Sequence, residues 1–364
     1  MSASGKVVIS DGALREFAER ILEGASLSGE AAAVTADCLV YANLRGVDSH
    51  GVQLLTFYLD HLLGGNIDIR GSGRVLTELG CCLLYDGENC VGQVVSAACT
   101  DHAVRLAAAH GAGLVSVRRS NHFGAAAYWA QRMSTRGMIG IAMCNASPSV
   151  APWQGTDRRV GTNPICMSVP GENGRPWLLD MATTTVAMGK IFKARLAGGT
   201  TIPPGWAMDK DGAPTTDIET AIGGLLMPLG GYKGSGLAML VEILCGVLSG
   251  GAMATEVGGV YILSRPMGTS HFFLAIDVAR LMPLGEFRQR MDRLVETVKS
   301  SRPAAGFDEV LVAGDPEWRL EDERRRTGIA LDAGVWAKLT ATAARVGVEP
   351  PPHVILENDP ATGP

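Results

Sequence analysis

Side chains capable of acid–base chemistry lie close together near the N-terminal end of the sequence. Residues 45–51 read RGVDSHG, which places a guanidinium, a carboxylate, a hydroxyl and an imidazole within six residues. Histidine is the side chain most easily poised to give or take a proton near neutral pH, and an adjacent hydroxyl can orient it or a substrate. Asp, Ser and Gly also stabilise turns. The stretch therefore indicates either a proton-transfer site built on Ser49 and His50 or an ordinary turn.

A second candidate site is the glycine-rich loop at residues 229–236, LGGYKGSG, which comes directly before an expected helix. Glycines let backbone amides approach a ligand, a helix N-terminus favours negative charge, and Lys233 completes a phosphate site. The loop lacks the residue order of a Walker A motif, and it does not form a Gly-x-Gly-x-x-Gly fingerprint after a strand. A flexible surface loop is the alternative. The density of glycine at the helix start favours the phosphate site.

The remaining polar candidates give weaker signals. His122 lies in the run NHFG at an expected strand-to-helix turn, where α/β proteins usually place ligands. A helix cap or a buried structural histidine is the alternative. No spacing of His, Cys, Asp and Glu resembles a metal site, so we expect no metal. Glu242 lies in an apolar helix and either pairs with a buried cation such as Lys233 or marks the helix's wet edge, which is the favoured reading.

The elements that would position these side chains follow from hydrophobic periodicity and from helix start and stop signals. Asp11 can cap the first helix, and the second starts after Ser28 and delivers residues 45–51 at its C-terminal end. Helices and strands then alternate, which is typical of an α/β protein. The expected helices cover residues 12–23, 29–43, 54–63, 93–110, 125–136, 236–248, 286–300, 317–326 and 334–346. The expected strands cover 75–85, as one or two strands, and 114–117, 138–143, 177–181, 260–263 and 271–277, and residues 145–176 are expected to be irregular.

Composition limits the function classes. The 364 residues suit one large or two ordinary domains and carry 32 basic and 37 acidic side chains, with no block of like charges. Nucleic-acid and membrane-surface binding therefore lack their usual signature. No secretory signal is visible, and the apolar run 236–248 is shorter than the roughly 20 residues of a membrane span. Eight cysteines without a Cys-x-x-Cys pair indicate reduced thiols. We expect a cytoplasmic protein whose partner is a small molecule.

Six stretches, taken in sequence order, resemble the malate/L-lactate dehydrogenase family, nicotinamide oxidoreductases that do not use a Rossmann fold. The family includes ureidoglycolate and sulfolactate dehydrogenases, diketogulonate reductase, and the piperideine-carboxylate reductases that reduce cyclic imino acids. Each motif alone is weak, but together they cover nearly the whole chain. The stretches are residues 45–51, 121–124, 161–164, 180–183, 228–236 and 271–277.

The resemblance implies an α/β fold of the non-Rossmann malate/L-lactate dehydrogenase type, a mixed sheet with helical N- and C-terminal segments. It also implies a homodimer with two domains in each chain. Residues 1–76 plus 285–364 would form a helical domain, and residues 77–284 an NAD(P)-binding α/β domain. NADH or NADPH would bind in an elongated pose between the domains. The cofactor would bring the hydride, while the protein supplies orientation and a matched proton.

The same resemblance implies roles for individual residues. His50, backed by Ser49, would protonate the product oxygen or nitrogen and act as the base in the reverse direction. His122 would lie beside the nicotinamide as a second candidate acid or base, and Thr162 would contact the substrate. The implied cofactor contacts are His122, Phe123, Gly124, Ala125, Ala126, Asp180, Met181, Ala182, Lys233 and Gly234.

Two departures from the family pattern stand out. An arginine usually stands four residues after the motif histidine and clamps the substrate carboxylate, whereas this sequence has Leu54. Losing a hydrogen-bonded charge pair costs on the order of a few kcal/mol. Either Arg45 or another cation has therefore taken over the carboxylate, or the substrate has none at that point. The second departure is VAGDPE at residues 312–317, where the family tends to have Pro-Gly-Glu, which leaves the contacts of that loop open.

We therefore expect an NAD(P)H-dependent reductase or dehydrogenase that acts on a ketone/alcohol or imine/amine pair with an atypical substrate. Within the enzymes, an imine reductase acting on a cyclic C=N bond is the alternative to a ketoreductase. A non-catalytic relative that binds or scaffolds is the alternative from another class, and joint retention of Ser49, His50, His122 and Lys233 argues against it. A phosphate-transferring enzyme using residues 230–236 would need Mg²⁺, and no acidic metal motif is evident.

Overall fold

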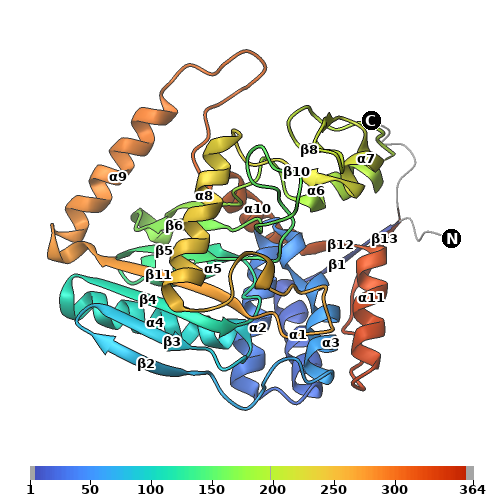
Figure 1. Cartoon of the computed structure of the whole chain (residues 1–364), viewed down its shortest axis with the longest axis horizontal. Coiled ribbons are helices and arrows are strands. Elements are labelled where there is room, and N and C mark those ends of the chain that lie inside the picture. The colour runs from blue at the N-terminus through green and yellow to red at the C-terminus, as the bar shows by residue number, and fades with distance from the viewer. Residues whose placement is uncertain (1–4, 197, 358–364) are drawn as a thin grey trace.

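A seven-stranded mixed sheet forms the centre of the computed structural model, which describes residues 5–196 and 198–357 (Figure 1). The pairing of β3 with β4 is parallel, and the other pairings in this sheet are antiparallel. The mixed α/β fold expected from the sequence is therefore confirmed. Across the sheet the strands follow the order β2 (Arg74–Leu79), β3 (Cys82–Asp86), β4 (Ala112–Ser120), β11 (Thr269–Asp277), β5 (Met138–Cys144), β6 (Ile165–Val169) and β7 (Trp177–Met181).

Two helices, α4 (Gly92–His110) and α5 (Ala126–Ser134), pack on one face of this sheet. They bury a core with the strands in which Trp129 and Phe273 are fully enclosed. Helix α4 can lie this close to β4 because residue 113 is glycine. A Cβ at that position would lie 2.1 Å from the carbonyl oxygen of Ala103. Close packing of this kind fixes the start of β4 against α4, and residues 121–124 follow the other end of the strand.

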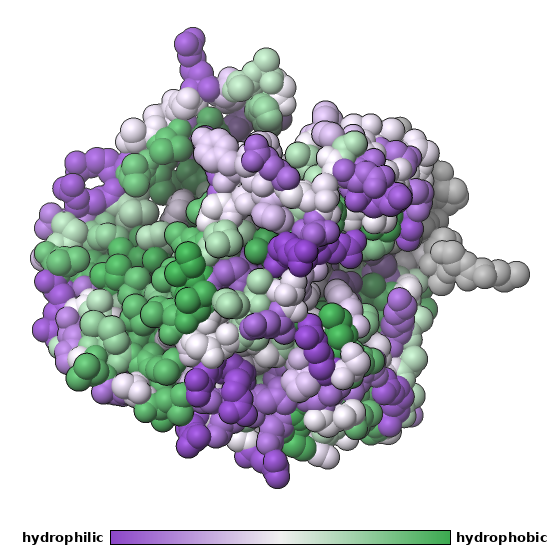
Figure 2. Space-filling model, viewed as in Figure 1, coloured by the Kyte–Doolittle hydropathy of each residue, from purple (hydrophilic) through white to green (hydrophobic). Residues whose placement is uncertain are grey.

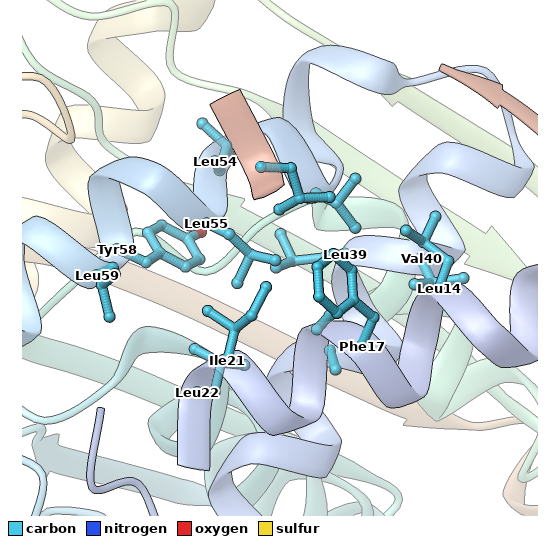
Figure 3. Close-up of a cluster of buried hydrophobic side chains, with 14 of the residues drawn as sticks. Leu14, Phe17, Ile21, Leu22, Leu39, Val40, Leu54, Leu55, Tyr58 and Leu59 are labelled. Atoms are coloured by element: carbon cyan, nitrogen blue, oxygen red, sulfur yellow. The ribbon is translucent and has the colours of Figure 1, made fainter. Parts of the chain in front are cut away.

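Three N-terminal helices build a second core: α1 (Asp11–Gly24), α2 (Gly29–Leu44) and α3 (Leu55–Leu63). The hydroxyls of Ser10 and Ser28 accept hydrogen bonds from backbone N–H groups in the first turns of α1 and α2, as good N-caps do. Figure 3 shows side chains from all three helices meeting in one apolar cluster. Fully burying a side chain such as Phe17 or Leu39 contributes about 1.5–3 kcal/mol each. This core therefore anchors α3 and the residues just before it.

A small antiparallel sheet joins the two ends of the described chain. Its central strand is β1 (Gly5–Ile9), which pairs with β12 (Ile329–Asp332) on one side and β13 (Val354–Glu357) on the other. Two C-terminal helices, α10 (Asp315–Thr327) and α11 (Ala333–Ala344), pack near this sheet, and α10 contacts α2. Late residues are thereby placed beside the N-terminal helices.

The opposite face of the central sheet carries α8 (Tyr232–Glu242), which continues as a π-helical turn over Ile243–Val247. Beyond the sheet, α9 (Leu284–Lys299) projects away from the body of the molecule, and none of its residues is buried (Figure 1). A broad apolar area lies over α8 and its surroundings in Figure 2. Its exposed side chains include Met239, Leu240, Ile243, Val247 and Leu248.

The segment between β7 and α8 forms a small unit of its own. It contains α6 (Met188–Leu196), α7 (Ile218–Gly223) and a three-stranded sheet of β8 (Ala207–Met208), β9 (Pro214–Thr215) and β10 (Leu225–Leu226). Its apolar side chains form a separate cluster around Ile191. The unit returns the chain to the glycine-rich loop before α8.

Several expectations about elements were wrong. Residues 260–263 form turns rather than a strand, and the stretch 145–176 contains β6, which pairs on both sides in the central sheet. Glu242 neither marks a wet edge nor pairs with Lys233. It is buried, and its carboxylate accepts hydrogen bonds from the amide of Asn163 at 2.9 Å and from the backbone N–H of Ala254 at 3.1 Å.

Candidate active site

Hydrogen bonds from two neighbouring side chains hold the turn that carries Ser49 and His50 in place. It leaves α2 and forms a short 3-10 turn at Asp48–His50. Asp48 accepts hydrogen bonds from the amide of Asn43 at 2.7 Å and from the guanidinium of Arg324 at 2.8 Å. The Asn43 amide also packs under Gly51, where a Cβ would lie only 2.3 Å from its oxygen. Since Asn43 and Arg324 hold this turn, the direction of the His50 side chain is set by the fold.

His50 and His122 face each other across this site. Their ring centroids are 5.5 Å apart, with 24° between the ring planes. The Nδ1 atom of His50 lies 3.0 Å from the hydroxyl oxygen of Ser49. Both imidazoles remain accessible to solvent, although protein surrounds them. Loss of hydration lowers the pKa of His50 below its usual value, so the neutral ring dominates near pH 7.

His122 follows the end of β4 and is held by several contacts. Its Nδ1 atom lies 2.7 Å from the hydroxyl of Tyr58 on α3 and accepts a hydrogen bond from the backbone N–H of Gly124 at 3.3 Å. Its own backbone N–H donates to the sulfur of Met267 at 3.3 Å. Burial, followed by the neighbouring imidazoles of His50 and His271, lowers the pKa of His122 to about 3. His122 is therefore a neutral, well-positioned imidazole.

The residues after His122 form the wall behind it. Phe123 is buried and stacks on His271 with ring centroids 4.6 Å apart. Gly124 has a φ of 78°, a conformation that favours glycine, and turns the chain into α5. Ala125 and Ala126 are buried at the start of that helix. The side chains of this stretch are thus directed into the core, and its backbone is the part next to the site.

Asp180 links this wall to the end of β7. One carboxylate oxygen of Asp180 accepts a hydrogen bond of 2.9 Å from the backbone N–H of Ala127, at the start of α5. Solvent still reaches Asp180, yet enough protein surrounds it that loss of hydration raises its pKa to about 6. The following residues, Met181 and Ala182, are half-buried. Two stretches implied as cofactor contacts, 123–126 and 180–182, therefore meet at one place.

Two backbone hydrogen bonds connect Thr162 with the glycine-rich loop through Thr183. The carbonyl of Thr162 accepts a hydrogen bond from the N–H of Thr183 at 2.9 Å, and the carbonyl of Thr183 accepts one from the N–H of Leu229 at 3.0 Å. Packing is tight, since a Cβ on Gly234 would lie 2.3 Å from the Leu229 nitrogen. The ammonium-bearing side chain of Lys233 is exposed in the first turn of α8. The structure thus joins the predicted positions 162, 180–182 and 233–234.

Two sequence-predicted substrate contacts are not placed at this site. Arg45 is 3% exposed, donates to Glu321 at 2.9 Å, and has its guanidinium 4.0 Å from the ring centre of Trp318. That guanidinium is committed to a buried ion pair and is not available as a carboxylate clamp. Leu54 is 2% exposed and lies in the N-terminal core, as Figure 3 shows. The interpretation of both residues as substrate contacts is therefore corrected.

Two residues beside the histidine pair, Tyr58 and Gln93, belong to no motif that predicts a site. The hydroxyl of Tyr58, on α3, contacts Nδ1 of His122. Gln93, in the first turn of α4, donates from its amide nitrogen to the Tyr58 hydroxyl at 2.9 Å. Both are buried polar side chains within apolar stretches. That contrast was the only signal in the sequence, and a single buried hydroxyl or amide is too common to be assigned without its partner.

Within residues 5–196 and 198–357, no three His, Cys, Asp or Glu side chains gather closely enough to hold a metal ion. No helix in those ranges is long and apolar enough to cross a membrane.

Comparison with known proteins places this geometry in context. Residues 9–340 match the model of a family described as malate/L-lactate dehydrogenase. A malate dehydrogenase from Pyrococcus horikoshii is 39% identical over 344 residues, covering 92% of this chain and 94% of that protein. An L-sulfolactate dehydrogenase from Methanocaldococcus jannaschii is 35% identical, covering 90% and 94%. A ureidoglycolate dehydrogenase (NAD(+)) from Escherichia coli is 34% identical, covering 92% and 95%.

Solved structures agree with the sequence relatives. The structure of malate dehydrogenase from Pyrococcus horikoshii superposes with a TM-score of 0.87 at 36% identity, covering 95% of this chain and 97% of that one. The structure of a delta1-piperideine-2-carboxylate reductase from Pseudomonas syringae superposes with a TM-score of 0.81 at 27% identity, covering 92% and 99%. The fold is shared along nearly the whole chain.

Proposed function

The chain belongs to the malate/L-lactate dehydrogenase family and is a pyridine-nucleotide-dependent oxidoreductase, and from this we propose that it interconverts a small 2-hydroxy acid and the corresponding 2-oxo acid at the His50 and His122 pair. The stacked, solvent-accessible imidazoles carry this proposal. Both rings can give or take a proton. His122 directly precedes the backbone segment 123–126, and the N–H of the next residue, Ala127, donates to Asp180.

The residues present fit a nicotinamide dinucleotide. Gly230 and Gly231 have φ values of 59° and 68°, so the loop exposes backbone beside Lys233 at the start of α8, where a phosphate is favoured. The backbone at 123–126 and residues Asp180 to Ala182 would hold the nicotinamide and ribose end. When bound, the cofactor supplies or accepts the hydride. The choice between NADH and NADPH depends on whether the protein contacts the 2′-phosphate, which only NADPH carries.

The protein's part in the reaction is the movement of one proton. During oxidation, the hydroxyl proton of the substrate passes to Nε2 of His50 as its C–H bond yields the hydride and the carbonyl forms. During reduction, the same nitrogen returns the proton to the product oxygen. Ser49 orients the ring through its contact with Nδ1. The lowered pKa of His50 favours the neutral, proton-accepting form near pH 7, which suits oxidation.

A substrate panel tests this proposal. Purified protein is mixed with NAD⁺ or NADP⁺ and with malate, lactate, sulfolactate or ureidoglycolate, and the nicotinamide absorbance is followed. We expect one cofactor and at least one hydroxy acid to give turnover in the wild type that is lost in His50→Gln and kept in His110→Gln, since His110 is exposed at the end of α4. Turnover that survives in His50→Gln would contradict the role of His50, and absence of turnover with every pair would contradict the substrate class.

Reduction of a cyclic C=N bond is the second candidate. The similarity in fold to delta1-piperideine-2-carboxylate reductase favours it, because the same histidine pair could protonate a nitrogen in place of an oxygen. Adding a cyclic imino acid with NADH and NADPH to the panel separates the two reactions. Faster turnover of the imine than of every 2-oxo acid would make this candidate the function.

We also propose that the chain forms a homodimer. Apolar side chains are exposed on α8 and on the unburied helix α9, where Leu294 is 57% and Val298 is 44% exposed, and such exposure is typical of a protein–protein interface (Figure 2). A second copy of the chain is the expected occupant. Light scattering should give twice the mass of the chain, and Leu294→Glu with Val298→Glu should yield monomers. A monomeric wild type would contradict this proposal.

A further inference from the structure

We propose that Tyr58 and Gln93 are positioning residues that hold His122 in the tautomer with hydrogen on Nε2, so that His122 can only donate a hydrogen bond to the substrate oxygen. The inference rests on the proposed function for its consequence in catalysis. It assigns different roles to two imidazoles that the sequence presents as equivalent candidates, with His50 as the proton acceptor and His122 as a fixed donor.

The first observation is the hydrogen bond that the backbone of Gly124 donates to His122. The Gly124 N–H points at Nδ1 of His122, with the nitrogens 3.3 Å apart. A backbone N–H can only donate, so Nδ1 must present its lone pair. A proton on Nδ1 would bring two N–H groups head to head. In a neutral imidazole the single ring hydrogen then lies on Nε2.

The second observation is the hydroxyl of Tyr58, whose oxygen lies 2.7 Å from the same Nδ1 atom. Since Nδ1 accepts from Gly124, the hydroxyl must also donate to it. Gln93 enforces that direction, because its amide nitrogen donates to the Tyr58 oxygen at 2.9 Å. The oxygen's one hydrogen is thereby left for His122. Tyr58 and Gln93 are 4% and 1% exposed, so water does not compete for these contacts.

The surroundings keep the ring neutral. The groups that act on the protonation of His122 are the imidazoles of His50 and His271, and both oppose a positive charge. His50 lies across the site and His271 lies behind Phe123 on β11. Burial also raises the pKa of Tyr58, so its hydroxyl keeps its hydrogen. The arrangement is rigid, because a Cβ on Gly92 would lie 2.3 Å from the carbonyl oxygen of His122.

The consequence is a division of roles between two similar side chains. A substrate hydroxyl both accepts and donates one hydrogen bond, and it needs a donor and an acceptor placed together. His122 offers Nε2–H, which stabilises the oxygen as negative charge develops on it, and His50 offers the lone pair that takes the proton. If both tautomers of His122 were populated, a fraction of the enzyme molecules would present an Nε2 lone pair from His122 beside the lone pair of His50. Two acceptors would bind the substrate hydroxyl in an unproductive way.

Nuclear magnetic resonance on protein with ¹⁵N-labelled histidine tests the tautomer directly. Long-range ¹H–¹⁵N correlation spectra separate the protonated from the unprotonated ring nitrogen, and His122→Gln assigns the signals by their loss. We expect the Nε2–H form for His122 between pH 6 and 8, with no titration in that range. An Nδ1–H form in the wild type would overturn the proposal.

Three variants test the two positioning residues. Tyr58→Phe removes the donor, and we expect mixed tautomers and a kcat reduced about 10-fold or more with little change in KM, since a wrong tautomer removes the donor the transition state needs. Gln93→Glu replaces a donor by an acceptor, which should turn the Tyr58 hydroxyl away from His122 and shift the tautomer likewise. Tyr85→Phe is the matched control, because this buried tyrosine donates to the carbonyl of Ser72, away from the site.

The outcomes are distinguishable from failure of the proposed function. The tautomer is observed in the resting protein without substrate or cofactor. A fixed Nε2–H form in a protein that oxidises no hydroxy acid would leave the positioning role intact and reject the function. Unchanged tautomer signals in both Tyr58→Phe and Gln93→Glu would reject the positioning role whatever the activity.

Discussion

The imidazole of His50 lies against that of His122 with 5.5 Å between ring centres, although 72 positions separate the two residues in the sequence. One comes from a 3-10 turn ahead of α3 and the other from the end of β4. The site therefore depends on how the N-terminal helices seat against the central sheet.

Replacement of His50 should remove the proton acceptor. We expect His50→Ala to lower kcat by about 10²-fold or more, because general acid–base catalysis contributes at least that much. The cofactor dissociation constant, measured by titration calorimetry, should change little. If cofactor binding weakened as much as turnover, His50 would be a binding residue and the assignment would be wrong.

Acid should destabilise the protein through its buried histidines. The pKa values of His122 and His271 are both lowered to about 3, so the unfolded chain binds protons at these rings below pH 6.5 and the folded chain does not. Stability is therefore lost as pH falls. Between pH 7.5 and 5.5 each ring should cost about 1.4 kcal/mol. Asp180, with its pKa raised to about 6, acts in the opposite sense, but this residue is exposed and solvent screening keeps its contribution small.

The two histidines dominate, so urea denaturation should show the free energy of unfolding falling by about 2–3 kcal/mol from pH 7.5 to 5.5. His271→Phe should reduce that fall by roughly 1.4 kcal/mol. Phenylalanine can keep the stacking on Phe123 and cannot titrate. A stability that rises toward pH 5.5 would contradict the assignment.

Glu242 should act as the support that ties α8 to the Thr162 stretch. Glu242→Ala removes the acceptor of one Asn163 N–H and of the Ala254 N–H, while the Asn163 amide keeps its bond to the carbonyl of Ala238. Each buried donor left unsatisfied costs about 1–3 kcal/mol. Glu242→Gln keeps one acceptor and should cost less. Urea midpoints of the two variants should therefore fall in the order Ala below Gln below wild type. Equal midpoints for all three would show that this carboxylate supports nothing.

Leu54→Arg tests the missing carboxylate clamp. Because Leu54 is buried in the N-terminal core, an arginine there should lower the free energy of unfolding by at least about 2 kcal/mol through an unpaired buried charge. Leu54→Met, of similar volume, is the control. An arginine variant with unchanged stability and a lower KM for malate would show that the side chain turns into the site, and would restore the interpretation of position 54 as a substrate contact.

Local sequence signals accounted for much of the fold. The helices expected at residues 12–23 and 93–110 were predicted to within one residue at each end, because apolar periodicity and the glycines at positions 24 and 111 act within a few residues of the element they delimit. The cap of the first helix is Ser10 rather than the expected Asp11. The strands at 138–143 and 271–277 were also found, since buried strands are apolar throughout.

The failures share a cause in long-range contacts. β6 escaped prediction because its surroundings are rich in proline and glycine, and it becomes a strand through pairing with β5 and β7. The roles of Arg45 and Leu54 were wrong for a similar reason. Arg45 has its partner 276 residues later, in Glu321, and no spacing within the motif could reveal that.

The hydrogen bonds from Arg324 to Asp48 affect when the turn at residues 48–50 becomes stable during synthesis. These residues lie 276 positions apart, and the two ends of the described chain share one small sheet. A ribosome makes the turn at residues 48–50 long before it makes Arg324. The N-terminal helices can form meanwhile, but the turn gains this support only after Arg324 has emerged. Activity should therefore arise late and abruptly in a growing chain.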